Sequence, residues 1–425
     1  MFKNLDRQVI SWALYDWANS AYATVVMAGF FPLFFQEYWD SGVNASGNSF
    51  EILGFGNAIA SIIIVLLAPI LGAIADAGGI KKILLACFAV LGIVATAGLF
   101  FAEQGEWILA ISLFILGTIG FSGANIFYDA LLISVSPRDR FDFISALGFA
   151  LGYLGGGLLF AFDVLMFLKP DLFGLSGQVE AIRISFITVA IWWALFSIPL
   201  LMFVHEKKTN KNKLTHKAVL DGWRQLVHTF DQVRKLRVVF VFLIAYWLYI
   251  DGVDTIVRMA IAYGQSIGLE SNHLITALLI TQFVGFPAAI AFGLLGARIG
   301  AKRGIFIAIG VYIGVTIWAF RMTSITEFYG LAIVVGLVQG GVQSLSRSFY
   351  ARIIPANKSA EFFGFYNMLG KFAAVFGPLI MGVVGLLTKD PRLAILSIIV
   401  LFIAGGVLLW FVDEEKGRKM AQELE

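Results

Sequence analysis

Long apolar segments alternate with short polar ones along almost the whole chain. Twelve of the apolar segments are long enough to cross the hydrocarbon core of a bilayer, which takes about 20 residues of helix. Because lipid offers the backbone no hydrogen-bond partner, each segment is expected to be a helix. The pattern therefore predicts an all-α membrane protein with twelve transmembrane helices. The first six start near Val9, Glu51, Ile83, Trp107, Phe143 and Ile182, and the last six near Val238, His273, Gly304, Glu327, Glu361 and Leu393.

The composition also indicates a membrane protein. Of the 425 residues, 59% are hydrophobic and 14% are charged, whereas soluble domains are about 25% charged. The single cysteine, Cys87, cannot form an intramolecular disulfide, and the four histidines (His205, His216, His228 and His273) lie outside the long apolar runs. We therefore expect no disulfide framework, no metal centre and no cofactor.

Lysine and arginine are distributed unevenly between the loops. The N-terminal segment, the even-numbered loops and the C-terminal tail hold 23 of the 31 basic residues, and the odd-numbered loops hold five. Because cytoplasmic loops carry the excess of positive charge, both termini are predicted to be cytoplasmic. The short loops favour a multi-pass protein of the bacterial inner (plasma) membrane, and a monomer is expected.

A basic segment divides the predicted spans into two sets of six. This segment, residues 205–237, is predicted to be a cytoplasmic linker that contains an amphipathic helix. The predicted domains are then an N-terminal six-helix bundle over residues 1–204 and a C-terminal six-helix bundle over residues 238–413. Residues 414–425 form a cytoplasmic tail.

The two halves repeat the same loop motif at the same spacing. The first copy lies between the second and third spans, and the second copy between the eighth and ninth, with Ala297 where the first copy has an aspartate. Their matching residues are Gly72, Asp76, Gly79, Lys81 and Lys82 in the first copy and Gly293, Gly300, Lys302 and Arg303 in the second. Two halves built alike imply a pseudo-two-fold axis along the membrane normal, with a central cavity between two pseudo-symmetric bundles.

The first copy resembles the signature loop of the major facilitator superfamily. Its glycines allow close helix approach and a tight turn, and the Asp76 carboxylate can hold helix termini and basic residues when the cytoplasmic side is shut. Ile80 stands where relatives commonly have a basic residue. The plain alternative is a positively charged cytoplasmic loop without a gating role.

Polar and ionisable residues within the spans form the second signal. Each charge at the middle of a membrane helix costs about 2.5 to 3.5 kcal/mol on insertion scales, so such residues are functional candidates. They fall on the first, fourth, seventh, tenth and eleventh spans, and the first four of these line the central cavity in the superfamily fold. The candidate substrate and proton pathway comprises Tyr15, Asp16, Asn19, Asn125, Asp129, Asp251, Asp254, Arg258, Gln343, Arg347, Asn367 and Lys371.

Several of these residues also have structural interpretations. Asp254 and Arg258, one helical turn apart, are placed to neutralise each other. Asp129 and Arg347 occupy related positions in the two halves, so they could form a lock between the bundles instead of contacting a solute. Lys371 could extend to the interface or neutralise an aspartate.

Buried carboxylates also suggest an energy source. A carboxyl group that faces one side of the membrane and then the other can exchange protons, so proton coupling follows as a hypothesis. Asp16, Asp251 and Asp129 are the candidates, in that order. The mixture of cations, carboxylates and amides suits a small polar or zwitterionic solute.

Four segments resemble the vacuole effluxer-like (UMF) family of the major facilitator superfamily. They are residues 13–22 (ALYDWANSAY), 72–82, 340–355 (GGVQSLSRSFYARIIP) and 361–382 (EFFGFYNMLGKFAAVFGPLIMG). The resemblance implies the major facilitator fold and export of a solute, with amino acids as candidates because fungal members look like vacuolar amino-acid exporters. Asp129 departs from the amide expected at its position.

Other classes of function are weaker alternatives. Within transporters, a lipid or lysolipid flippase of the same fold is the main competitor. A membrane enzyme would need a catalytic motif, and the sequence has no HExxH motif, nucleophile elbow or Walker loop. A membrane sensor would need an output domain. The expected partners are the lipid bilayer, a small solute and protons, with no nucleic acid.

Overall fold

The computed structural model describes residues 6–41, 49–206, 236–266 and 271–424. All regular structure in these ranges is helical, so the all-α prediction is confirmed. Each of the twelve predicted spans coincides with a helix whose start lies within four residues of the predicted one. The amphipathic linker helix predicted within residues 205–237 falls almost wholly outside the described residues.

The helices of the first half follow the predicted order. They are α1 (Arg7–Ala21), α2 (Phe31–Phe34), α3 (Ser49–Gly78), α4 (Lys81–Gly98), α5 (Trp107–Val135), α6 (Phe141–Leu168) and α7 (Gln178–Phe203). The first span is less regular than its pattern predicts, because two π-helical segments, Tyr22–Phe30 and Phe35–Trp39, flank α2. Wider turns of this kind re-aim side chains within one continuous helix.

The second half continues with the same alternation. Its helices are α10 (Arg237–Ser266), α11 (Ser271–Ile299), α12 (Ala301–Arg321), α13 (Ile325–Ile353), α14 (Ser359–Thr388), α15 (Pro391–Leu396), α16 (Ile399–Trp410) and α17 (Glu414–Gln422). Eleven helical stretches of the described chain are long and apolar enough to cross a membrane. The one predicted span not among these eleven is the eleventh in chain order; it corresponds to α14, in which the side chains of residues 371–375 are outside the described set.

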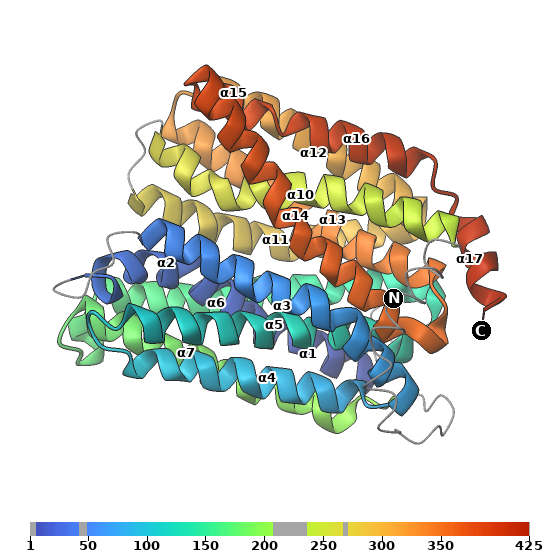
Figure 1. Cartoon of the computed structure of the whole chain (residues 1–425), viewed down its shortest axis with the longest axis horizontal. Helices are drawn as coiled ribbons and strands as arrows, with labels where there is room; N and C mark the ends of the chain where they lie inside the picture. Colours follow the sequence, from blue (N-terminus) through green and yellow to red (C-terminus); the bar gives the residue numbers. More distant parts are fainter. Residues whose placement is uncertain (1–5, 42–48, 207–235, 267–270, 425) are drawn as a thin grey trace.

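The helices form two groups that follow the two halves of the sequence (Figure 1). Helices α1–α7 lie in the lower part of the view and α10–α16 in the upper part, and both ends of the chain lie at the right of the molecule. We call this end the terminal end and the opposite one the far end. The side of the membrane that the terminal end faces stays a prediction.

The two groups pack closely at the terminal end, where glycines face the opposite group. A Cβ atom on Gly72 of α3 would lie 2.3 Å from the carbonyl oxygen of Ala360 in α14. A Cβ atom on Gly293 of α11 would lie 2.4 Å from the Ala146 Cβ atom of α6. Because both distances are shorter than real carbon contacts, only glycine permits this approach.

Candidate functional site

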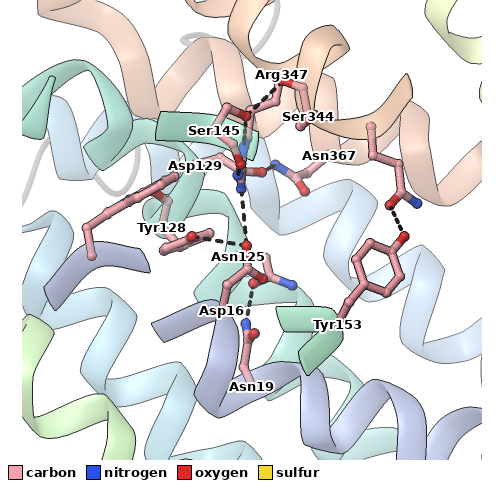
Figure 2. Close-up of polar contacts among 12 residues, drawn as sticks. Asp16, Asn19, Asn125, Tyr128, Asp129, Ser145, Tyr153, Ser344, Arg347 and Asn367 are labelled. Carbon is pink, nitrogen blue, oxygen red and sulfur yellow. Dashed lines mark hydrogen bonds and ion pairs between the residues drawn. The ribbon is translucent and has the colours of Figure 1, made fainter. Parts of the chain in front are cut away.

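An arginine from the second half reaches into the first half in the interior of the protein. The Nη1 atom of Arg347, on α13, lies 3.0 Å from the Asp129 Oδ1 atom on α5 and 3.7 Å from the Asp16 Oδ2 atom on α1 (Figure 2). The three residues are 2%, 7% and 8% exposed. Two carboxylates and one guanidinium therefore share one buried site between the two halves.

Further hydrogen bonds hold this cluster. The Arg347 Nε atom donates to the Ser145 Oγ atom at 2.9 Å, and the Nη2 atom donates to the Ser145 carbonyl oxygen at 2.8 Å. Asn367 donates from Nδ2 to the Asp129 Oδ2 atom at 3.0 Å. The Tyr128 hydroxyl donates to the Asp16 Oδ2 atom, also at 3.0 Å. Every charged group in the cluster thus has several partners, as a buried charge requires.

Three aromatic rings complete the surroundings of the guanidinium. Its central carbon lies 4.3 Å from the ring centre of Phe149, 5.0 Å from that of Trp12 and 5.3 Å from that of Tyr128. Cation–π contacts of this length contribute about 0.5–2 kcal/mol each, with the larger value for desolvated sites. The rings of Trp12 and Tyr128 are themselves stacked, with centres 4.5 Å apart.

Glycines on α6 make the room that this cluster occupies. A Cβ atom on Gly148 would lie 2.6 Å from the Tyr128 hydroxyl oxygen and 3.1 Å from both the Arg347 Nη2 and Asp16 Oδ2 atoms. On Gly152 it would lie 3.3 Å from the Asp16 Oδ1 atom. The glycine spacing in this span thus serves the polar cluster as well as helix packing.

Two further polar contacts lie in the helices that carry the cluster. Asn19, on α1, donates from Nδ2 to the Asn125 Oδ1 atom on α5 at 2.6 Å. The Tyr153 hydroxyl on α6 donates to the Gln343 Oε1 atom on α13 at 3.3 Å, and so joins the two halves. Tyr15 is buried, with its ring centre 5.3 Å from that of Tyr128.

The sequence analysis did not select five side chains of this site: Trp12, Tyr128, Ser145, Phe149 and Tyr153. Aromatic residues within a span are usually packing or lipid-facing groups, and a serine carries no charge. Helical spacing was the available signal, because Trp12 lies four residues before Asp16 on one face of α1.

The loop motif of the first half joins the two halves at the terminal end. The Asp76 Oδ2 atom accepts a hydrogen bond at 2.8 Å from the backbone N–H of Glu361, in the first turn of α14. Its Oδ1 atom lies 2.8 Å from the Lys81 Nζ atom, which donates to the Ser359 Oγ atom at 2.7 Å. The N-terminus of α14 is therefore held by a carboxylate that suits the helix dipole.

The remaining residues of the motif copies support the loops. Gly79 and Gly300 have φ values of 61° and 91°, which favour glycine. Lys82 donates from Nζ to the Val204 carbonyl oxygen at 2.6 Å, and Lys302 donates to the Val412 carbonyl oxygen at 2.7 Å. The Arg303 side chain is exposed.

The segment after α7 is tied to the first motif copy. The backbone N–H of Lys82 donates to the Glu206 carboxylate. Burial raises the pKa of Glu206 above its ordinary value, and the nearby lysines lower it only in part. The start of the linker is therefore anchored at the terminal end.

The second half uses a different contact where its motif copy lacks the aspartate. The Arg352 Nη2 atom, on α13, lies 2.7 Å from the Asp142 Oδ2 atom on α6. Ser348 donates from Oγ to the Asp142 Oδ1 atom at 2.5 Å. The sequence analysis did not select Asp142 or Arg352, because charges at span ends resemble ordinary loop charges. The two halves are thus joined at the terminal end by two unlike sets of polar contacts, one around Asp76 and one around Asp142.

Asp251 occupies a different place from the Arg347 cluster. Its Oδ1 atom accepts from the backbone N–H of Gly377 on α14 at 2.9 Å and from the Thr255 hydroxyl at 3.3 Å. Gly377 precedes Pro378, which lies inside α14, where a proline removes a helical hydrogen bond and favours a kink. Through these contacts, Asp251 stabilises α14 within the second half.

Other candidates on the same helices are only partly described. Asp254, on α10, is half-buried and has partners in the protein. The side chains of Arg258 and Lys371 lie outside the described set, so the predicted pairing of Asp254 with Arg258 stays a prediction. Among the described residues, no group of three His, Cys, Asp or Glu side chains is placed to hold a metal ion.

The role of Asp251 predicts a difference between two substitutions. Asp251→Ala should lower the melting temperature of the purified protein, because an unpaired buried N–H group at Gly377 costs about 1–3 kcal/mol. Asp251→Asn keeps an accepting oxygen and should melt close to the wild type. Thermal unfolding in detergent measures both, and equal losses in the two variants would contradict the support of α14 by this contact.

Comparison with known proteins places this chain in a family. The family described as "Vacuole effluxer Atg22 like" matches residues 41–135 and 134–422. The chain belongs to this family. It is 40% identical over 425 residues to the MFS-type transporter YxiO of Bacillus subtilis (strain 168), and the alignment covers 100% of this chain and 99% of that protein.

More distant relatives are fungal. Autophagy-related protein 22 of Yarrowia lipolytica is 28% identical over 311 residues, which cover 66% of this chain and 52% of the relative. The matching region therefore spans about half the length of that fungal protein.

Solved structures show the same fold. The human organic anion transporter MFSD10 (TETRAN) superposes with a TM-score of 0.72 at 16% identity, over 95% of this chain and 99% of that one. The MFS proton:xylose symporter XylE, bound to 6-bromo-6-deoxy-D-glucose, gives 0.69 at 14% identity, over 98% and 97%. The protein is an integral multi-pass membrane transporter of the major facilitator type and not an enzyme.

Proposed function

We propose that this transporter moves a small polar or zwitterionic solute by alternating access and that it is coupled to protons. Export is the favoured direction and amino acids are the candidate solutes, because the family is described as a vacuole effluxer. The observation that carries the proposal is the buried cluster of Asp16, Asp129 and Arg347, which lies between the two halves.

The charge of this cluster supports proton coupling. With both carboxylates ionised, the three groups carry a net charge of −1 in a site from which the protein excludes water. An unbalanced buried charge is costly, and one bound proton removes it. Asp16 is the proton carrier in this proposal, because it lies farther from Arg347 than Asp129 does.

The position of the cluster supports alternating access. Arg347, Arg352 and Asp76 all make contacts that join the two halves, and these contacts must break for the terminal end to open. Water would then reach the two carboxylates and stabilise their ionised forms, so that the proton leaves. Opening and closing of the terminal end is thereby linked to proton release and uptake.

Asp16→Asn tests the coupling. The asparagine side chain is neutral at every pH, so the remaining pair is balanced without a proton. In proteoliposomes with an imposed pH gradient and a mixture of radiolabelled amino acids, we expect gradient-driven accumulation in the wild type and its loss in Asp16→Asn. Exchange of labelled for unlabelled solute without a gradient should persist in the variant.

Asp171→Asn is the matched control, because Asp171 is exposed in the turn that follows α6. Full gradient-driven accumulation by Asp16→Asn would remove Asp16 from the proton pathway. Movement of a labelled lysolipid between leaflets, with no amino-acid transport, would favour a flippase instead.

A further inference from the structure

The Arg347 guanidinium occupies a receptor that is built entirely by the opposite half of the protein. We call this set of residues the cation receptor; it consists of Trp12, Asp16, Tyr128, Asp129, Ser145 and Phe149. These residues come from α1, α5 and α6, whereas the guanidinium that they surround comes from α13. The binding site and its occupant can therefore separate when the two halves move.

The receptor is matched to a guanidinium or ammonium group. It offers hydrogen-bond acceptors on Asp129 and on both the hydroxyl and the carbonyl group of Ser145, with the Asp16 carboxylate close by. Its three rings lie within 5.3 Å of the guanidinium carbon. Carboxylates combined with aromatic faces are the usual means by which proteins bind organic cations.

The receptor stays organised on its own side after Arg347 leaves. The Tyr128 hydroxyl holds the Asp16 carboxylate, and the Trp12 indole N–H donates to the Tyr128 carbonyl oxygen at 2.9 Å. Both contacts lie within the first half. A vacated receptor would therefore keep the Asp16 carboxylate and the rings of Trp12 and Tyr128 in place. Asp129, Ser145 and Phe149 stay on α5 and α6 of the same half. The two carboxylates then carry charge that needs a cation or protons to balance it.

We propose that the vacated receptor binds the guanidinium or ammonium group of a cationic solute, such as a basic amino acid, and that returning Arg347 displaces this group. The inference rests on the proposed transport function and gives it a substrate class. When the terminal end opens, the solute takes the place of Arg347. When it closes, Arg347 returns and expels the solute toward the far end.

This displacement gives transport a direction. The receptor is available to solutes while the terminal end is open and is filled by Arg347 while that end is shut. If the terminal end is cytoplasmic, as the charge distribution predicts, the cycle exports the solute. Protons and the cationic solute compete for the same two carboxylates, so they move in exchange for each other.

Arg347→Ala provides the first test, because it removes the guanidinium group that occupies the cation receptor. The probes are L-arginine and L-citrulline, which has nearly the same shape without the charge. We expect calorimetry on the purified full-length variant to give a dissociation constant for L-arginine about tenfold or more below that of the wild type. L-citrulline should bind neither protein. A double variant, Arg347→Ala with Asp129→Asn, should lose the gain.

A measurement on the wild type keeps the inference testable if Arg347→Ala does not fold. L-arginine should open the terminal end, and so increase hydrogen exchange at the Glu361 amide, which donates to Asp76. The expected increase is about threefold or more relative to the same concentration of L-citrulline. Equal exchange with both probes, or equal binding of both by a folded Arg347→Ala protein, would overturn the proposal.

The two proposals fail in different ways. If the pH gradient drives only uncharged amino acids and L-arginine does not bind, the transport function stands and the cation receptor is wrong. If L-arginine binds Arg347→Ala but no amino acid is transported by the wild type, the receptor stands and the proposed transport function is wrong.

Discussion

Proteoliposomes that contain Arg347→Ala should lose solute transport, by about 100-fold or more, while the protein inserts into the membrane normally. The substitution leaves Asp16 and Asp129 without the guanidinium that balances them. Removal of one partner from a buried ion pair costs about 3–5 kcal/mol, and each 1.4 kcal/mol changes an equilibrium tenfold. Because this contact forms between the two halves, the cost falls on the state with the terminal end shut.

Arg321→Ala is the matched control for this variant. Arg321 is the last residue of α12 and is exposed, so its loss should leave the transport rate near that of the wild type. Membrane insertion is checked by the amount of monodisperse protein extracted with detergent. Unchanged kinetics in Arg347→Ala would mean that the contact with Asp129 and Asp16 has no part in the transport cycle.

Gly72→Val should disfavour closure of the terminal end. The added Cβ atom would lie 2.3 Å from the Ala360 carbonyl oxygen and 2.8 Å from the Glu361 Cα atom, and both are backbone atoms that cannot rotate away. Overpacking costs about 1–3 kcal/mol, which lowers the population of the shut state about 5- to 150-fold. Transport should fall accordingly, and the terminal end should become accessible to water-soluble reagents.

Gly314→Val separates this effect from the general effect of valine in a membrane helix. Gly314 lies on α12 with no atom within 4 Å of an added Cβ atom. We expect near-normal transport for this control. Comparable transport by Gly72→Val would show that close approach of α3 and α14 is not required for the cycle.

The fold was predictable because the bilayer imposes one requirement on every span. A run of about 20 apolar residues must satisfy its own backbone, so helix number and helix starts follow from hydropathy. The break between α15 and α16 and the π-helical turns of the first span were not predictable. These features do not alter the run of apolar residues along the chain. They change only the directions in which side chains point around the helix axis.

The candidate site was predictable in its charged residues and in several of its amides. The cost of charge in hydrocarbon singles out Asp16, Asp129 and Arg347 from the sequence, and the repeat relates two of them. It does not reveal that Phe149 and Ser145 face Arg347, because neither residue is costly in a span. The contact between Asp142 and Arg352 was missed although both residues are charged, because charges at the ends of spans are common and do not indicate a functional site.

The difference between the two motif copies is explained by the structure. In the first half, Asp76 holds the first turn of α14. In the second half, Ala297 cannot make the equivalent contact, and an ion pair between Arg352 and Asp142 joins α13 to α6. The two-fold repeat is therefore kept in the helices and lost in the charges that close the terminal end.

The central claim is that the contact of Arg347 with Asp16 and Asp129 forms and breaks as the terminal end closes and opens. Spin labels at Asp139→Cys and Arg303→Cys, both exposed near the terminal end, measure this directly once exposed Cys87 is replaced by serine. We predict a short and a long distance between the labels, with the long one favoured as pH rises and dominant after Arg347→Ala. A single distance, unchanged by pH and by the loss of Arg347, would contradict the account.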